Sequence, residues 1–227
     1  MTELDHFEEH GFATWSTVIN HGTLNNLYFF KDVWDNPQRG HSCDDKYHHT
    51  YANDIQWGNY WTESLSDHTE VLSISSSIRH VINQLLDEPV FYHSDVSVLM
   101  PGSTTIRPHV DTPYRHEPWN HKINQRLGVQ VAIPMQEFEL TAGHTAFLPG
   151  SHRKYWNIRD CYNGVHTDEF KSGAVQPELA FSDVIIWDAR TLHSQMPNPT
   201  NTPRYVLLLN YVEKRIYNQL NEFENAL

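Results

Sequence analysis

Beyond Pro89 the chain consists mainly of short apolar segments, and this pattern constrains the fold more than any other feature. In residues 126–134, apolar side chains at every second position share one face, and Gln130 lies on the opposite face. Pro-Gly and Ala-Gly pairs separate successive segments. The predicted strands are 91–99, 104–109, 126–134, 144–148, 183–187 and 204–212. Many short strands divided by turns predict a mainly β fold, a jelly roll or barrel.

One amphipathic helix is predicted before these strands, over residues 76–88. Its apolar residues recur at helical spacing, serines stand where they would cap the first turn, and Pro89 would end it. A chain of 227 residues suits one domain. We interpret residues 1–90 as a helical and irregular flank, 91–212 as the β core, and 213–227 as a C-terminal tail.

Composition excludes several classes of protein. The net charge of −12 disfavours nucleic acids and anionic membranes as partners. No run of 18 apolar residues is present, and the acidic first ten residues do not resemble a signal peptide, so we expect a cytoplasmic protein. Cys43 and Cys161 are too few for a disulfide framework. No pattern in the sequence indicates the oligomeric state.

Sixteen histidines give the chain many imidazoles, which are the side chains that most often bind metals. His109 and Asp111 form an H-x-D triplet at the end of predicted strand 104–109, where residues two apart point to the same side. His193 follows a later predicted strand. Two histidines and one carboxylate are the ligand set of non-haem Fe(II) oxygenases, which keep other positions on the metal open. A surface histidine beside a turn aspartate remains an alternative interpretation.

Three arginines lie close to these ligand candidates in the sequence. Arg204 is 11 residues after His193 and opens the apolar segment 204–212. A guanidinium directed into a barrel needs a carboxylate partner, which it binds through two parallel hydrogen bonds. A structural salt bridge at the start of a strand is the alternative. Arg107 and Arg126 flank the triplet, and either bind an anionic substrate or pair with internal carboxylates.

Three further side chains near these motifs are interpreted as structural. Trp187 is expected to pack in the core rather than to stack on a substrate. His144 and His152 are expected to be turn or surface residues rather than substrate contacts.

Together these motifs resemble the Fe(II)/2-oxoglutarate-dependent dioxygenase superfamily, and within it the phytanoyl-CoA dioxygenase-like branch. The resemblance covers about residues 91–212, and its most specific parts are the Pro-Gly-Ser-His run and the interval from His193 to Arg204. The matching pieces are His109-Val-Asp111, the run Gly143–His152, the segment Asp183–Trp187 leading to His193, Asn198, and Arg204 with its strand.

The resemblance implies a double-stranded β-helix, the cupin-like jelly roll, with flanking N-terminal helices. It implies that the cofactors are Fe(II), the co-substrate 2-oxoglutarate and O2. The implied metal ligands are His109, Asp111 and His193. Arg204 would hold the distal carboxylate of 2-oxoglutarate, and Thr112 and Gln195 would help to bind this co-substrate, with Gln195 standing where some relatives have serine.

The implied reaction is hydroxylation of a small molecule or an amino-acid side chain, with 2-oxoglutarate converted to succinate and CO2. Asp111 favours hydroxylation, because halogenase relatives replace this carboxylate with a small residue. A non-catalytic or sensory β-barrel, and a cupin-type metal enzyme that does not use 2-oxoglutarate, remain as alternatives. Residues 1–75 and the insert 152–180 are expected to form the lid and walls, and carry no pattern that identifies the substrate.

Overall fold

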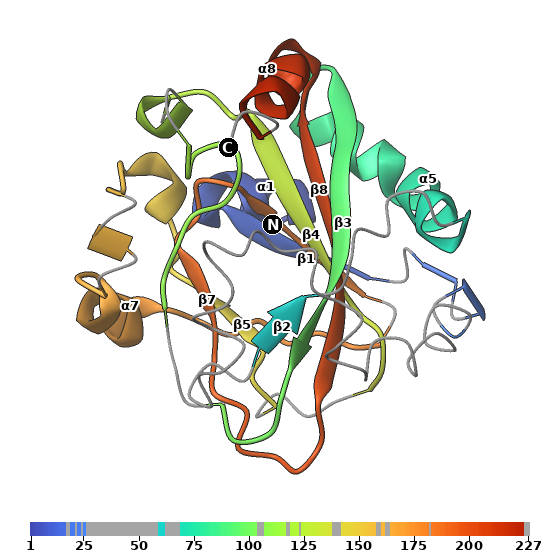
Figure 1. The fold of residues 1–227 in the computed structure, drawn as a ribbon, viewed down its shortest axis with the longest axis vertical. Coiled ribbons are helices and arrows are strands. Elements are labelled where there is room, and N and C mark those ends of the chain that lie inside the picture. The colour runs from blue at the N-terminus through green and yellow to red at the C-terminus, as the bar shows by residue number, and fades with distance from the viewer. Residues whose placement is uncertain are drawn as a thin grey trace.

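Two antiparallel sheets form the core of the computed structural model (Figure 1). The larger sheet has the strand order β1-β6-β4-β8-β3-β2, and the smaller one pairs β5 with β7. The structure describes residues 1–16, 19–20, 22–23, 25, 59–61, 69–103, 107–116, 119–122, 124–137, 142–157, 160–161, 164–181 and 183–224. The strands are β1 (Phe12–Trp15), β2 (Asn59–Trp61), β3 (Pro89–Leu99), β4 (Gly128–Pro134), β5 (Thr145–Phe147), β6 (Val184–Asp188), β7 (His193–Gln195) and β8 (Arg204–Glu213).

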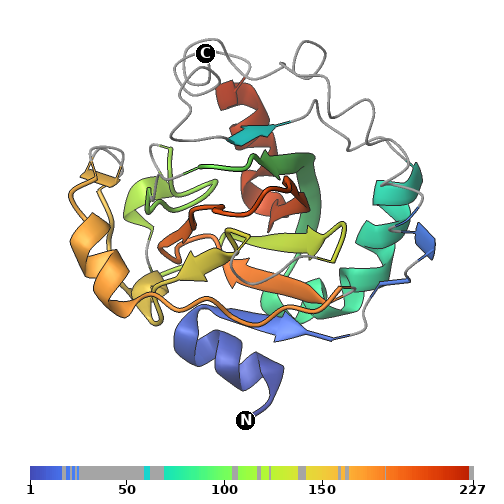
Figure 2. The ribbon, with the colours of Figure 1, turned by 90° about the horizontal axis from the view of Figure 1, so that it is seen from below.

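Helices lie outside the sheets. They are α1 (Glu3–His10), α5 (Thr69–Leu85), α7 (Thr167–Gly173) and α8 (Lys214–Glu224), with short 3-10 turns η1 (Trp119–His121) and η2 (Ser151–Arg153). In Figure 1 the larger sheet separates α5 on the right from β5, β7 and α7 on the left. Figure 2 shows the same arrangement from below, with α1 beside β1. No helix in the described part of the chain is long and apolar enough to cross a membrane.

Helix α5 packs against the outer face of the larger sheet. Every third or fourth residue of this helix is apolar and buried, which is the spacing of one helical face. The facing strand residues alternate with those that point to the opposite side of the sheet. The buried helix residues are Val71, Ile74, Ile78, Val81, Ile82 and Leu85, and the strand residues include Val96, Val98, Val129, Val131, Leu207 and Leu209.

Truncating Ile78 tests this packing. Ile78 is fully buried in the α5 interface, so Ile78→Ala is expected to lower the free energy of unfolding by about 2–5 kcal/mol. Leu72 lies on the same helix but is exposed, so Leu72→Ala should change stability by less than about 0.5 kcal/mol. Urea unfolding followed by circular dichroism measures both. Equal losses in the two variants would contradict the assignment of the buried face.

The smaller sheet lies over the inner face of the larger one. Phe147 of β5 is fully buried and stacks on Phe12 of β1, with ring centroids 4.8 Å apart. Its ring also lies 5.4 Å from that of Trp187 on β6. At the other side, the amide of Gln195 on β7 donates to the hydroxyl of Ser97 on β3 at 2.7 Å. These contacts join the two sheets across the interior.

The N-terminal segment is part of the larger sheet. Strand β1 pairs with β6, with Phe12 opposite Trp187. Gly11, before β1, adopts the left-handed conformation with φ 87°. A Cβ there would lie 2.5 Å from both His152 Nδ1 and Thr191 Oγ1, so only glycine permits this close approach. Thr191 Oγ1 also donates to the Gly11 carbonyl at 2.8 Å, which ties this segment to the loop that precedes β7.

The mainly β fold with flanking helices is confirmed, but several boundaries were wrong. Helix α5 begins at Thr69, so Ser76 and Ser77, the serines expected to cap it, lie inside the helix. Ser75, just before them, is buried and accepts a hydrogen bond from the Tyr211 hydroxyl. The region 1–90 contributes two strands to the sheet, and the expected tail forms α8.

The predicted strand 104–109 is not formed as expected. Residues 107–108 are irregular and His109 forms only an isolated bridge, while 104–106 lie outside the described residues. The insert 152–180 contains the end of η2 and all of α7. Cys161 is a buried free thiol, and Cys43 lies outside the described residues.

Candidate active site

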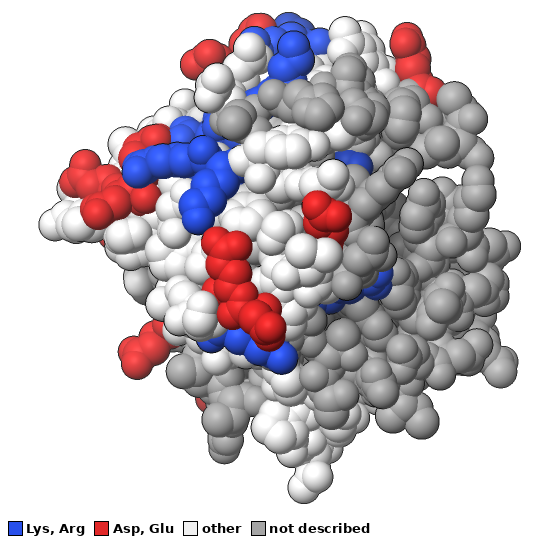
Figure 3. All heavy atoms as spheres, turned by 90° about the vertical axis from the view of Figure 1, so that its left-hand side faces the viewer, with Lys and Arg blue, Asp and Glu red and all other residues white. Residues whose placement is uncertain are grey.

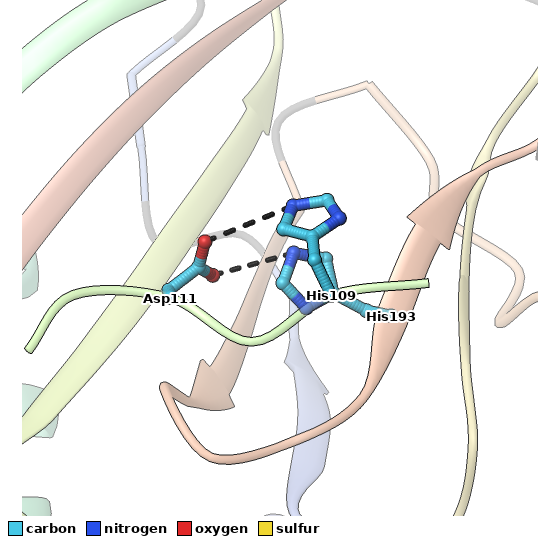
Figure 4. A group of neighbouring side chains, drawn as sticks. All are labelled: His109, Asp111 and His193. Carbon is cyan, nitrogen blue, oxygen red and sulfur yellow. Dashed lines mark ion pairs between the residues drawn. The ribbon is translucent and has the colours of Figure 1, made fainter. Parts of the chain in front are cut away.

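His109, Asp111 and His193 come together at the edge of the interior (Figure 4). The backbones of His109 and His193 form a bridge with two hydrogen bonds of 2.9 and 3.0 Å. The Asp111 amide donates to the Ala189 carbonyl at 2.8 Å, which fixes the carboxylate beside the two rings. One potential ligand atom from each residue lies within 4.8 Å of the others. The structure therefore brings His193 to the His109–Asp111 pair, which lies far earlier in the sequence.

Hydrogen bonds set the orientation of both imidazoles. His109 Nδ1 lies 2.9 Å from the Arg107 carbonyl, and His193 Nδ1 lies 2.9 Å from the Thr191 carbonyl. A carbonyl only accepts, so each Nδ1 carries a proton, and Nε2 is the nitrogen that each ring can offer to a metal. The two Nε2 atoms lie 3.9 and 3.3 Å from the Asp111 carboxylate. Burial, assisted by the neighbouring His193, lowers the pKa of His109 to about 4, which keeps this ring neutral at neutral pH.

Trp187 orients the carboxylate. Its indole Nε1 donates to Asp111 Oδ2 at 2.8 Å, and its ring lies 5.1 Å from that of His193. Trp187 is buried, as expected for a residue that packs in the core. The hydrogen bond to Asp111 was not predicted. A tryptophan in a buried strand carries no sequence signal that tells a hydrogen-bonding role from a packing role.

The donor atoms of the three residues fit a divalent transition metal. Two imidazole nitrogens and one carboxylate, all on one side, are the donors that suit Fe(II) and leave other positions open. Hydrogen bonds from the far nitrogen of each imidazole, and from Trp187 to the carboxylate, are the outer contacts that hold metal ligands in place.

Arg204, the first residue of β8, is buried on the inner side of the larger sheet. Its Nη1 donates to the Gly143 carbonyl, and burial lowers the pKa of Arg204 to about 9. The amide of Asn198 donates to the carbonyls of Leu99 and Thr202, which shapes the loop that leads into β8. A guanidinium held in a site this dry is a strong binding group for a carboxylate.

His144 and His152 are not surface residues as expected, because both are buried. Burial, followed by the charge of Arg204, lowers the pKa of His144 to about 4. Thr112 directly follows Asp111 and is buried. Gln195 lies on β7 two residues after His193. Both expected co-substrate contacts therefore lie within two residues of a ligand candidate along the chain, and their roles stay a prediction.

Of the two interpretations of Arg126, binding of an anionic substrate or pairing with internal carboxylates, the structure shows the pairing. Arg126 binds Asp188 at 2.9 Å and Glu8 at 2.8 Å, and Arg190 binds the same Asp188 at 2.5 Å. Although burial acts in the opposite direction, these arginines hold the pKa of Asp188 below its usual value. On the face that carries α7, basic side chains also lie next to acidic ones (Figure 3), as in the Lys154–Glu169 pair at 3.3 Å.

Solved structures share this fold at low sequence identity. EvdMO1 has a TM-score of 0.67 and 16% identity over 93% of this chain, which spans only 49% of that chain. The non-haem α-ketoglutarate-dependent epimerase SnoN of nogalamycin biosynthesis has a TM-score of 0.64 and 14% identity over 93% of this chain and 82% of its own. HygX from Streptomyces hygroscopicus, solved with nickel and 2-oxoglutarate, has a TM-score of 0.68 and 12% identity. The match covers 94% of this chain and 88% of the HygX chain. These likenesses confirm the double-stranded β-helix.

Sequence comparison supplies the family. A search of curated proteins finds no match. The model of the phytanoyl-CoA dioxygenase family matches residues 21–206, which is most of the chain. The chain therefore belongs to the phytanoyl-CoA dioxygenase family of oxygenases, which use Fe(II), 2-oxoglutarate and O2.

Proposed function

We propose that this protein hydroxylates a small molecule or an amino-acid side chain and converts 2-oxoglutarate to succinate. The observation that carries the proposal is the group of His109, Asp111 and His193, with both Nε2 atoms turned toward the carboxylate. These three residues would hold Fe(II). When bound, the metal supplies O2 activation coupled to decarboxylation of 2-oxoglutarate.

The co-substrate would be held mainly by Arg204. Its buried guanidinium would bind the distal carboxylate of 2-oxoglutarate through two hydrogen bonds. We assign Thr112 and Gln195 as further contacts. The Gln195 amide nitrogen already donates one hydrogen bond to Ser97, which leaves its second N–H and its carbonyl oxygen for a ligand.

The interior around His193 supports chemistry that must exclude water. Phe147 is fully buried, with its ring 5.9 Å from that of His193 and 5.4 Å from that of Trp187. These aromatic rings close one side of the ligand group and lower the local dielectric constant, which strengthens every charge interaction there.

Hydroxylation is the outcome that Asp111 supports. The Asp111 carboxylate would be the third protein ligand of the metal. It would occupy the coordination position that a halide would otherwise take. Analysis of the oxidised product by mass spectrometry tests this step: hydroxylation adds one oxygen atom, whereas epimerisation leaves the mass unchanged.

Succinate formation tests the proposed function. The purified protein is loaded with Fe(II) and 2-oxoglutarate without oxygen and then exposed to air. We expect succinate from the wild type and from the exposed-histidine control His80→Ala, and none from His109→Ala or Arg204→Ala. Absence of succinate from the wild type, together with absence of Fe(II) and 2-oxoglutarate binding, would reject the enzymatic proposal.

Trp187→Phe is expected to weaken metal binding about 10–100-fold, because the ring is kept but the hydrogen bond to Asp111 is lost. Trp156→Phe is the matched control, since its indole donates instead to the Ser151 carbonyl. Anaerobic titration with Fe(II) measures both variants. Equal metal affinities for Trp187→Phe and the wild type would show that the indole only fills space.

A further inference from the structure

Three polar side chains form a cluster on the inner face of the larger sheet. They are Asp95 on β3, Gln130 on β4 and Asn210 on β8, three strands that lie side by side. Gln130 is directly opposite Asn210 in the β4–β8 pair. Asp95 is opposite Leu208, so it is the diagonal neighbour of Asn210. We refer to these three residues as the polar wall.

The polar wall shares its face with the candidate active site. Gln130 is also directly opposite Trp187, whose indole binds Asp111. Directly opposite residues of antiparallel strands point to the same side. Asn210 lies six positions after Arg204 on the same strand, and alternation puts both on one side. The polar wall therefore faces the interior that contains the ligand candidates.

Two acceptor atoms of the polar wall lack the hydrogen bonds that buried polar groups normally form. The Oδ1 atoms of Asp95 and Asn210 are buried and have no partner among the residues that the structure describes. The other carboxylate oxygen of Asp95 lies 3.4 Å from His93 Nε2. Gln130, which completes the wall, is only 7% exposed. Buried polar atoms are satisfied in the great majority of folded proteins, and a bound ligand would satisfy both Oδ1 atoms at once.

The inner face of the larger sheet is partly exposed at the polar wall. In β8, Leu208 and Asn210 are the two residues that are not fully buried, and both lie on the inner face. On β3, Asp95 is likewise only partly buried, whereas its neighbours Ser94 and Val96 are fully buried. On the opposite face, Val96, Leu207 and Leu209 are buried against α5, so the exposure next to the polar wall lies on the side of the candidate active site.

We propose that the polar wall recognises the substrate, and that this substrate is a small molecule with neighbouring hydroxyl or amine groups. The assignment rests on the proposed function. Carboxylate and amide oxygens accept hydrogen bonds, so they select O–H and N–H donors. The negative charge of Asp95 favours a neutral or cationic ligand, and Arg126 is occupied by Glu8 and Asp188 rather than available to an anion. A long hydrocarbon chain would leave both Oδ1 atoms unsatisfied.

The first test measures stability and needs no ligand. Gln130→Leu and Asn210→Leu replace inner-face amides with apolar side chains, and Asn210 Oδ1 has no partner among the described residues, so each is expected to raise the Tm of the protein by about 2–4 °C. The matched control is Gln84→Leu, on the exposed face of α5, which should leave Tm unchanged. A lower Tm in both inner variants would show that these amides hold the fold together, and would overturn the proposal.

The second test measures recognition with four probes of one ring size. These are scyllo-inosamine (an amine and hydroxyls), scyllo-inositol (hydroxyls only), quinate (hydroxyls and a carboxylate) and cyclohexanol (one hydroxyl). The full chain is loaded with Zn(II), a redox-inert stand-in for iron, and 2-oxoglutarate, and Kd is measured by ligand-observed NMR. Scyllo-inosamine and scyllo-inositol are expected to bind at least 10-fold more tightly than the other two. Each inner leucine variant should weaken them about 10-fold, and Gln84→Leu should not.

Binding of quinate or cyclohexanol as tight as that of the inositols would overturn the proposal. So would absence of binding by the inositols, or unchanged binding in the inner variants. Zn(II) and 2-oxoglutarate affinities are measured first in every variant. Their loss in the wild type would reject the proposed function, whereas intact values with failed probe recognition would reject only the polar wall.

Discussion

Asp111→Ala is expected to abolish succinate formation and to weaken Fe(II) binding by more than 100-fold. Loss of an outer contact to a metal ligand typically costs 10–100-fold in affinity, and Asp111 is itself the carboxylate of the ligand group. Without it, two neutral imidazoles remain and the site has no negative charge to offset that of the cation. Anaerobic Fe(II) titration and succinate assays measure the two effects.

Asp111→Asn separates charge from shape in this position. An asparagine keeps an acceptor oxygen for the Trp187 indole but removes the charge, so it should bind Fe(II) nearly as poorly as the alanine variant. Asp168→Asn, on the exposed surface of α7, is the control and should behave as the wild type. Wild-type metal affinity in Asp111→Asn would mean that the metal binds elsewhere.

Arg204→Met is expected to lower 2-oxoglutarate affinity by about 100-fold or more, because a buried carboxylate would lose its cationic partner. Methionine is similar in length and apolar, so the ligand-free variant should remain folded. Arg215→Met, on the exposed surface of α8, serves as the control and should bind 2-oxoglutarate normally. Equal affinities in the two variants would remove Arg204 from the co-substrate site.

The pH dependence provides a separate check on Arg204. Burial lowers the pKa of Arg204 to about 9 in the folded protein, below the usual value of 12.5. At pH values between these two, the unfolded chain binds more protons, so the stability of the ligand-free protein gains a contribution as pH rises through this window. The affinity for 2-oxoglutarate should fall above pH 9, because the neutral side chain binds a carboxylate weakly. In Arg204→Met, the side chain at position 204 does not titrate, so it should contribute neither the rise in stability nor the fall in 2-oxoglutarate affinity.

The sequence predicts the fold class correctly, and it identifies ligand candidates, because both depend on local signals. Alternation in 126–134 marks β4, and the spacing in 76–88 marks most of α5. The H-x-D triplet needs only that two side chains project to one side. The structure brings His193 to this triplet, and its role as a metal ligand stays a prediction.

Features that depend on distant partners were not predicted. Strands β1, β2 and β7 have three or four residues each and are defined by pairing rather than by a pattern of their own. Alternation in 126–134 predicts that Gln130 lies on a solvent-facing side of its strand. That side is instead the interior, where Gln130 is buried opposite Trp187. Burial on both faces of β4 is a property of the assembled sheets.

The pairing of β1 with β6 has a consequence for the order in which the protein matures. Phe12 is synthesised well before Trp187, its partner in the pairing, because a large part of the sequence lies between them. Until then β1 has no strand to pair with, and Asp111 has no indole to orient it. Contacts between such distant segments slow folding, because a long loop must close before they form. Metal-binding competence should therefore appear in a single late step, after β6 has left the ribosome, rather than growing gradually with chain length.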